Sequence, residues 1–379
     1  MTETLLQDPA PSDAARQGRG YGRPTLKDSV LMVGTVVDLE LRQRVRSVAW
    51  YVLLGVAALV LAAVTLLLLA TAGAFGGEGG DQVVSVVVYL VLLLGTLVTP
   101  ALSGAAVNGD RDAGTLATTQ ITLVGTWQLL LGKFLAAWTA ALAFLAVALP
   151  FLAVALVAGG VQVGIVLTAL AVTVLELGVI AAVGVGLSSV IPRPIFSVVT
   201  TYLVVAALSI GTAVAFGLAG LAFPRTTTYS YTTYSESALD ADGKVVNPVC
   251  DPPDVSTSRS PTYDRVWWLL AANPYVVLAD ATPSRFSRDG STQDSFTSFK
   301  AGVRSLQIAR PTEEVQDDCN PSANRPASYP SQQQIVEQTV PTWSVGLLIH
   351  LVLGAVCLIA GARALRTPAR RLAKGSRIA

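Results

Sequence analysis

Residues 50–74 read WYVLLGVAALVLAAVTLLLLATAGA and contain no Asp, Glu, Lys or Arg. Because roughly 20 apolar helical residues cross the hydrocarbon core of a bilayer, this segment predicts a transmembrane helix. That core offers no water to unpaired backbone groups, which favours helices over irregular chain. Five further segments have similar length and composition, and of these only the third carries a charge, Glu176: residues 83–107, 134–158, 161–191, 195–223 and 343–362. The sequence therefore predicts an all-α polytopic membrane protein with six transmembrane helices.

The composition of the whole chain agrees with this fold class. Charged residues make up 13% and hydrophobic residues 52%, which leaves too little charge to cover a water-soluble globule. The net charge of +1 lacks the basic excess of a nucleic-acid-binding protein. One histidine and three cysteines, in no metal-binding spacing, argue against a zinc site or a histidine-based catalytic centre. We expect no catalytic residues, no metal and no nucleic-acid partner.

Basic residues gather at the two ends of the chain. Residues 1–49 hold seven Lys and Arg, and residues 363–379 hold six with no acidic residue. The connection between the first two spans has only acidic charges, Glu78 and Asp81. The positive-inside rule then places both termini in the cytoplasm, which an even number of spans allows. The Ala-, Val-, Leu- and Gly-rich composition indicates a GC-rich bacterial source, and hence a bacterial cell membrane.

This orientation makes residues 224–342 a large extracellular segment between the fifth and sixth spans. The β-prone residues at 226–234 show no apolar alternation and predict a strand only weakly. Cys250 and Cys319 would lie in an oxidising compartment, where disulfides persist. A bridge between them would close a loop of about 70 residues and stabilise the segment by roughly 4 kcal/mol. Two unrelated free thiols are the alternative.

Within this segment, residues 266–279 (VWWLLAANPYVVLA) are apolar but too short to span a bilayer. Trp267 and Trp268 suit the depth of the lipid headgroups. The stretch is predicted to be a re-entrant or interfacial element. The core of the extracellular domain is the alternative.

Residues 25–47 precede the first span with apolar residues at roughly helical spacing. Arg42, Arg44 and Arg46 gather towards the end of this stretch. The pattern predicts a helix along the cytoplasmic interface, with its basic groups near anionic membrane lipids. A purely structural anchor is the alternative role.

The connection between the second and third spans carries the most informative motif. Residues 110–116 read DRDAGTL, and residues 127–133 read WQLLLGK. Together they resemble the signature of ATP-binding-cassette (ABC) transporter permeases of the second exporter class. Asp110 and Asp112 stand where that signature usually has glutamates. Further stretches that resemble the family are residues 40–47 (ELRQRVRS), residues 184–194 (GVGLSSVIPRP) and the pair Asn273-Pro274.

The resemblance implies a role for each part of the chain. The helix at 25–47 would be a connecting helix, and residues 109–122 would be a coupling helix that docks on a separate ATP-binding subunit. That subunit would hold ATP and Mg²⁺, because residues 125–133 lack the spacing of a phosphate-binding loop and this chain is expected to bind no cofactor. A second permease copy, identical or paralogous, would complete the transporter. The residues implied in ATPase coupling are Asp110, Arg111, Asp112, Gly114, Thr115 and Leu116.

Two polar residues lie inside the predicted spans. Glu176 lies near the middle of the fourth span and His350 lies in the sixth, where such residues are costly and often face a bundle interior. Nothing in the sequence around Glu176 forms a polar relay. A structural hydrogen-bonding role is therefore favoured over a functional one for both residues.

The leading hypothesis is the membrane-spanning permease of an ABC exporter, which is not an enzyme by itself. The alternative is a membrane sensor whose extracellular domain recognises a ligand and signals to a cytoplasmic partner. A polytopic enzyme would need clustered acid, base or metal ligands at one membrane face, which the sequence lacks. The predicted layout is a disordered cytoplasmic N-terminus (1–24), the interfacial connecting helix (25–47), transmembrane helices one to five (48–223) with the coupling helix (109–122), the extracellular domain (224–342), the sixth helix (343–365) and a basic cytoplasmic tail (366–379).

Overall fold

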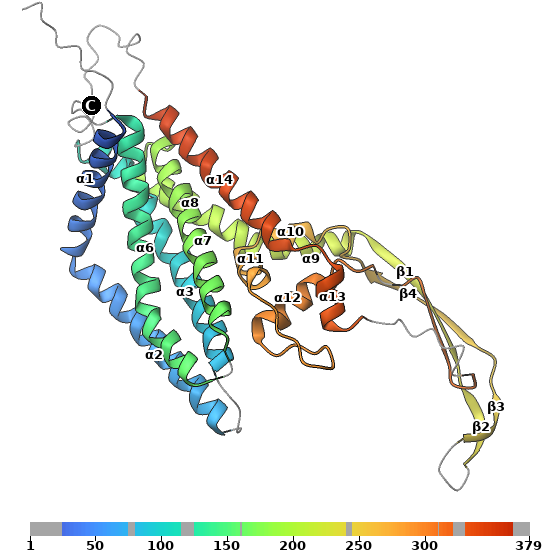
Figure 1. The fold of residues 1–379 in the computed structure, drawn as a ribbon. Coiled ribbons are helices and arrows are strands. Elements are labelled where there is room, and N and C mark those ends of the chain that lie inside the picture. The colour runs from blue at the N-terminus through green and yellow to red at the C-terminus, as the bar shows by residue number, and fades with distance from the viewer. Residues whose placement is uncertain are drawn as a thin grey trace, which may run out of the picture.

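The computed structural model describes residues 25–74, 80–114, 125–159, 161–239, 245–309, 311–320 and 330–366. The predictions for residues 1–24, for the tail beyond Arg366 and for Thr115 and Leu116 therefore lie outside the described residues. Within the described ranges the chain is mostly helical, and six helices are long and apolar enough to cross a membrane (Figure 1). This is the architecture of a multi-pass membrane protein.

The six long helices lie close to the predicted spans. The fifth is the least regular, because a π-helical turn separates two α-helical parts. Pro100 and Pro150 lie inside the second and third of these helices, where neighbouring helices can accommodate a kink. The spans are α2 (Val48–Ala74), α3 (Gly80–Ser103), α6 (Thr126–Val157), α7 (Val163–Val190), the composite of α8 (Pro194–Ala206), η2 (Ala207–Gly211) and α9 (Thr212–Ala222), and α14 (Thr342–Ala364).

The bundle is built around α3 and α7. In the most apolar stretch of the span that contains α3, 61% of the residues are buried, and in that of α7 the share is 56%. The corresponding values are 17% for α2 and 11% for the fifth span. The outward surfaces of α2 and of α8–α9 therefore face lipid or a further protein chain.

Small residues set the spacing between α7 and α14. A Cβ atom at Gly186 would lie 2.4 Å from the carbonyl carbon and oxygen of Cys357. A Cβ atom at Gly361 would lie 3.0 Å from the Cβ of Ser189. Such close approach of helix backbones is typical of packing in membranes, where lipid tails give no hydrophobic drive to associate.

The helix α1 (Leu26–Val45) precedes the first span. It begins with a capping box, in which Thr25 and Asp28 each accept a hydrogen bond from the other's backbone N–H. It then packs against the first turns of α6, where a Cβ atom at Gly132 would lie 2.6 Å from Val36. We call this end of the bundle, at which α1 and α6 begin and α14 ends, the basal end (Figure 1).

Residues 224–341, the distal segment, contain strands as well as helices. Cys250 at the end of β3 and Cys319 after β5 form a disulfide. The strands extend away from the helices as an arm (Figure 1). One sheet has the order β4-β1-β5, with β1 antiparallel to β4 and parallel to β5, and a second sheet pairs β2 with β3. The strands are β1 (Pro224–Thr232), β2 (Tyr234–Leu239), β3 (Val245–Cys250), β4 (Asp254–Pro261) and β5 (Glu313–Asp317).

The all-α prediction is therefore incomplete for the distal segment. The weak strand predicted at 226–234 is part of a sheet whose partners lie far away in sequence, with Thr228 opposite Glu313. Pairing of this kind depends on contacts between strands that are distant in sequence. A local alternation of apolar and polar residues, which would predict a strand, is absent from residues 226–234.

Four short helices in the described part of the distal segment lie beside the start of α14 (Figure 1). Two of them lie in the predicted re-entrant stretch, and Val277, Leu278 and Ala279 are fully buried in the same apolar core as residues of α2, α3, α6 and α7. Leu270 and Val276 pack instead with Val303 of the distal segment. The stretch thus joins the span ends to the distal helices. These are α10 (Trp268–Ala271), α11 (Pro274–Ala281), α12 (Ser295–Ser305) and α13 (Gln332–Gln338).

We expect the substitution Gly186→Ala to lower the free energy of unfolding by about 1–3 kcal/mol, because its methyl group forces α7 and α14 apart. The matched control is Gly164→Ala in the same helix, where no atom lies within 4 Å of the added Cβ. Thermal unfolding in detergent checks both variants. Equal unfolding temperatures for the two would contradict the packing account.

Candidate functional site

A buried lysine joins three elements at the basal end. The Nζ atom of Lys133, near the start of α6, lies 2.5 Å from Oε1 of Glu40 on α1. It also lies 2.6 Å from Oδ2 of Asp110 on α4 (Asn108–Asp112). The lysine side chain is only 2% exposed, whereas those of Glu40 and Asp110 are 18% and 36% exposed. We call these three residues the Lys133 cluster.

A second cation balances the charge of this cluster. Arg44 of α1 donates a hydrogen bond from Nη2 to the carbonyl oxygen of Leu102, at 3.0 Å. Burial lowers the pKa of the Arg44 guanidinium, and the negative charge of Glu40 opposes that shift. With Arg44 counted, the two cations and two carboxylates of this region have a formal charge of zero. Neutrality limits the cost of holding charge in a dry environment.

Hydrogen bonds to Ser188, near the end of α7, hold the start of α4 against a second span. The hydroxyl of Ser188 accepts hydrogen bonds from the backbone N–H groups of Val107 and Asn108, at 2.9 and 3.2 Å. The Asn108 side chain donates to the carbonyl oxygen of Ile191 at 3.1 Å. These contacts satisfy N–H groups that the first turn of a helix leaves unpaired. A side chain on α7 therefore takes the place of a capping residue in α4 itself.

Residues 115–122 of the predicted coupling helix lie outside the described residues. Within residues 109–114, α4 ends at Asp112, and Gly114 has a φ of +72°. A glycine in this left-handed region commonly ends a helix, since other residues are strained there. Arg111 is half-buried and Asp112 is exposed, so both can meet a partner.

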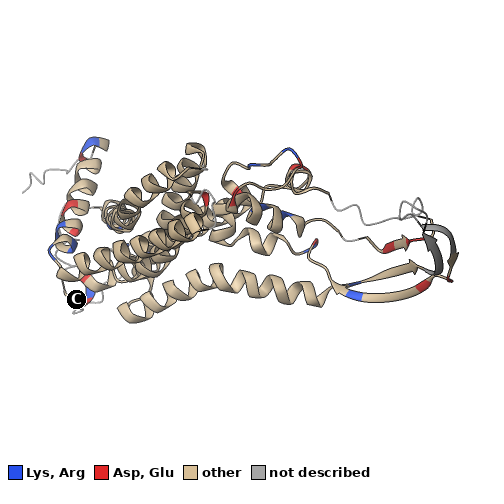
Figure 2. Ribbon diagram, turned by 90° about the horizontal axis from the view of Figure 1, so that it is seen from below, with Lys and Arg blue, Asp and Glu red and all other residues tan. Residues whose placement is uncertain are grey.

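The three arginines predicted to lie near lipid have different environments. Arg42 forms an exposed ion pair with Asp38, with Nε 2.9 Å from Oδ1. Arg44 points inward as described, and Arg46 is exposed at the end of α1. Figure 2 shows charged residues at the basal end and throughout the distal segment, while the long helices between them are almost uncharged.

No protein-family model matches this chain, and no curated protein matches it. A function for the chain is therefore inferred from the contacts within the chain itself.

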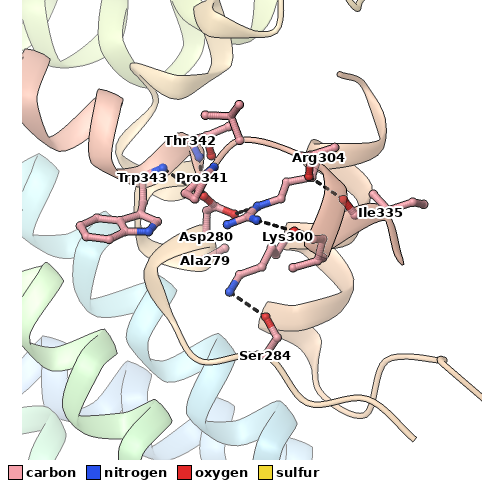
Figure 3. Close-up of polar contacts among 12 residues, drawn as sticks. Ala279, Asp280, Ser284, Lys300, Arg304, Ile335, Pro341, Thr342 and Trp343 are labelled. Carbon is pink, nitrogen blue, oxygen red and sulfur yellow. Dashed lines mark hydrogen bonds and ion pairs between the residues drawn. The ribbon is translucent and has the colours of Figure 1, made fainter. Parts of the chain in front are cut away.

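A second polar cluster lies where the distal segment meets α14 (Figure 3). The Oδ1 atom of the buried Asp280 accepts a hydrogen bond from Nε of Arg304 at 2.6 Å. Its Oδ2 atom accepts from the backbone N–H groups of Thr342 and Trp343, at 2.7 and 3.0 Å. Arg304 also donates to the carbonyl oxygen of Val336 at 2.9 Å. Asp280 thereby holds α11, α12 and α13 to the N-terminal end of a span, where the helix dipole favours a carboxylate.

A buried lysine lies beside this cluster. Lys300 of α12 donates to the carbonyl oxygen of Thr282, and to the hydroxyl of Ser284 at 2.9 Å. Burial lowers the pKa of the Lys300 amine to about 8, although the carboxylate of Asp280 opposes that shift. Among the residues that the structure describes, the amine has hydrogen-bond acceptors but, unlike Arg304, no carboxylate in contact.

Glu176 and His350 are in contact, which the sequence analysis did not predict. Nδ1 of His350 lies 3.0 Å from Oε1 and 2.9 Å from Oε2 of Glu176. Nε2 of His350 lies 2.9 Å from the carbonyl oxygen of Ala272 in the distal segment. The sequence around Glu176 did not indicate this partner, because His350 lies in another span. Within the described ranges, no three His, Cys, Asp or Glu residues gather as metal ligands.

Sequence reasoning gave no role to Glu40, Lys133 or Asp280. A signal existed for Lys133, since a lysine within the first turns of an apolar span needs a partner. Its two carboxylate partners lie on other elements, so the sequence alone did not identify them.

We expect Lys133→Met to lower the free energy of unfolding by about 2 kcal/mol, because it leaves two carboxylates facing each other without their cation. The partial exposure of both carboxylates keeps the loss below that of a fully buried pair. Adding Glu40→Gln and Asp110→Asn to this variant should restore part of the stability, measured by thermal unfolding.

The control for that experiment is Arg42→Met, which removes an ion pair whose side chains are 69% and 54% exposed. Exposed pairs of this kind contribute less than about 0.5 kcal/mol. If Lys133→Met is as stable as Arg42→Met, the cluster does not hold the basal end together.

We expect the free energy of unfolding to rise with pH between about 8 and the ordinary lysine pKa of 10.5. In that window the folded protein has released the Lys300 proton while the unfolded chain still binds it, so higher pH favours the folded state. Lys300→Met should remove this rise, whereas the exposed Lys27→Met should keep it. Thermal unfolding at several pH values in the window, at constant salt, measures the difference, and an unchanged slope in Lys300→Met would refute the assignment.

Proposed function

We propose that this chain is the membrane-spanning permease subunit of an ABC exporter, driven by a separate ATP-binding subunit at the basal end. The Lys133 cluster is the observation that carries this proposal. It links α4, which lies between two spans, to α1 and to α6 by ionic contacts of 2.5 and 2.6 Å. The sequence resemblance to permeases of the second exporter class supports the same reading.

In this proposal the ATPase subunit lies outside the membrane. Such a subunit can move the spans only by pressing on a part of the chain at the membrane surface. A displacement of α4 would be carried to α6 and α1 through Lys133, and to α7 through Ser188. Short ionic and hydrogen-bonded contacts transmit such a displacement better than a flexible loop would.

The docking residues in this proposal are Arg111 and Asp112. A groove on the ATPase with complementary charges would bind them through charge-assisted hydrogen bonds. The proposal places the basal end, and with it both termini, in the cytoplasm of a bacterial cell. ATP and Mg²⁺ would bind the partner subunit, so hydrolysis would take place there.

A second permease copy, identical or paralogous, would cover part of the outward surface of the bundle. The spans α2 and α8–α9 leave most of their apolar residues exposed. A path between two copies, lined by such residues, would suit a lipophilic or amphipathic substrate.

The distal arm favours one alternative function. The arm contains the Cys250–Cys319 disulfide and extends away from the bundle (Figure 1). In a membrane sensor, such an arm would bind the ligand. In that case the partner at the basal end would be a signalling protein instead of an ATPase.

The two functions are separated by mild purification of the chain from its native membrane. The permease proposal expects a stoichiometric ATP-binding subunit, together with ATP hydrolysis that depends on the permease. A stable complex that lacks such a subunit would favour the sensor.

We expect Arg111→Glu to release the ATPase and abolish permease-dependent hydrolysis without unfolding the chain, because it reverses the central charge of the docking helix. The matched control is Arg259→Glu on the exposed strand β4 of the distal arm, which should leave the complex intact. Copurification and thermal unfolding report on binding and folding separately. A folded Arg111→Glu variant that keeps its partner and full activity would exclude docking through α4.

A further inference from the structure

The contact between Glu176 and His350 lies deep among the helices. His350 is fully buried and Glu176 is 2% exposed. The histidine bridges two elements, since Nδ1 faces Glu176 on α7 and Nε2 faces the carbonyl oxygen of Ala272, between α10 and α11. His350 itself lies on α14, so three elements meet at one imidazole ring.

The hydrogen-bond partners determine where the protons lie. A carbonyl oxygen can only accept a hydrogen bond, so the contact of 2.9 Å requires a hydrogen on Nε2. The contact of 2.9 Å between Nδ1 and Oε2 then requires one further hydrogen between these two atoms. Without that hydrogen, a lone pair on Nδ1 would face a buried carboxylate. With a second one, the pair would carry an unpaired positive charge in an apolar bundle.

We propose that Glu176 and His350 form a proton-binding site inside the bundle. It holds one proton between Nδ1 and the carboxylate, and this proton keeps the turn at Ala272 and Asn273 fixed against α7 and α14. The pair is neutral whichever of the two atoms carries the proton. This inference does not depend on the transport proposal, because it follows from the contacts of His350 alone.

The same turn is held on its other side by the fifth span. The Asn273 side chain donates to the carbonyl oxygen of Ser209 at 2.6 Å and to the hydroxyl of Thr212 at 3.0 Å. Ser209 lies in the π-helical turn η2, whose irregular hydrogen bonding leaves backbone groups available to a neighbour. The turn is thus held between the fifth span on one side and the proton-binding pair on the other.

The buried charged groups on α11 and α6 have partners of their own. On α11, Asp280 pairs with Arg304, and on α6, Lys133 pairs with Glu40 and Asp110. The hydroxyl of Tyr275 on α11 lies 3.3 Å from that of Thr96 on α3. Among the described residues, Glu176 is the one charged side chain with an electrostatic interaction with His350.

The first experiment uses the fact that His350 is the only histidine in the chain. Full-length protein labelled with ¹⁵N-histidine and placed in phosphatidylcholine nanodiscs gives the spectrum of a single imidazole. We expect a hydrogen on Nε2, a hydrogen-bonded Nδ1 and no change across the range from about pH 6 to pH 8, where free histidine titrates. An Nδ1–H tautomer with a bare Nε2, or a titration in that range, would overturn the proposal.

The second experiment tests whether the shared proton fixes the turn. In a Cys357→Ala background, Val277→Cys places a thiol at a fully buried position just after the turn. Its labelling by a membrane-impermeant maleimide should be slow. Glu176→Ala should raise the rate by about tenfold, as expected for the loss of one hydrogen bond that keeps the turn closed.

The matched control is Glu176→Gln, whose amide can donate a hydrogen bond to Nδ1 without a titratable proton. We expect slow labelling in this variant, with a neutral imidazole that still carries its hydrogen on Nε2. If Glu176→Ala labels as slowly as Glu176→Gln, the pair does not hold the turn. The spectrum of the unsubstituted histidine decides the proton site even where Glu176→Ala does not fold.

Discussion

A charged side chain inside an apolar helix bundle needs its counter-charge beside it, because water is not there to solvate it. This constraint organises the molecule at three levels. Lys133 meets two carboxylates at the basal end, Glu176 meets His350 among the spans, and Asp280 meets Arg304 where the distal segment begins. Each cluster joins parts of the chain that are distant in sequence. Since the apolar surfaces between helices are interchangeable, these polar contacts fix which surfaces meet.

The span α7 takes part in one of these clusters and in a further polar contact. Ser188 near its end bonds to the start of α4, and Glu176 nearer its middle faces the histidine that reaches the distal segment. Glycines at its contact with α14 bring the two backbones close together. The helix α7 is stiff and makes polar contacts at two points along its length. It therefore connects the basal end to the distal segment more directly than any loop in the described chain.

The number and approximate positions of the spans could be predicted from sequence, because length and apolar composition are local properties. The disulfide was one of two alternatives, and the structure contains it. The sheets of the arm were missed, since β1 pairs with strands that follow it by many residues. The same limit hid the partners of Lys133, Glu176 and Asp280. A sequence shows that a buried charge needs a partner, but only the fold shows which residue that partner is.

The π-helical turn η2 has a consequence for how the fifth span can change. A turn of this kind contains one residue more than an α-helix would need, and each residue of an α-helix advances the side chains by about 100°. The extra residue is accommodated within the turn itself, so removing one residue from Ala207–Gly211 would restore a regular α-helix and leave the faces of α8 and α9 in register. The same deletion within the regular part of α9 would instead rotate all later side chains by about 100°. The turn can therefore offer the carbonyl oxygen of Ser209 to Asn273 without changing which side of the fifth span faces the bundle.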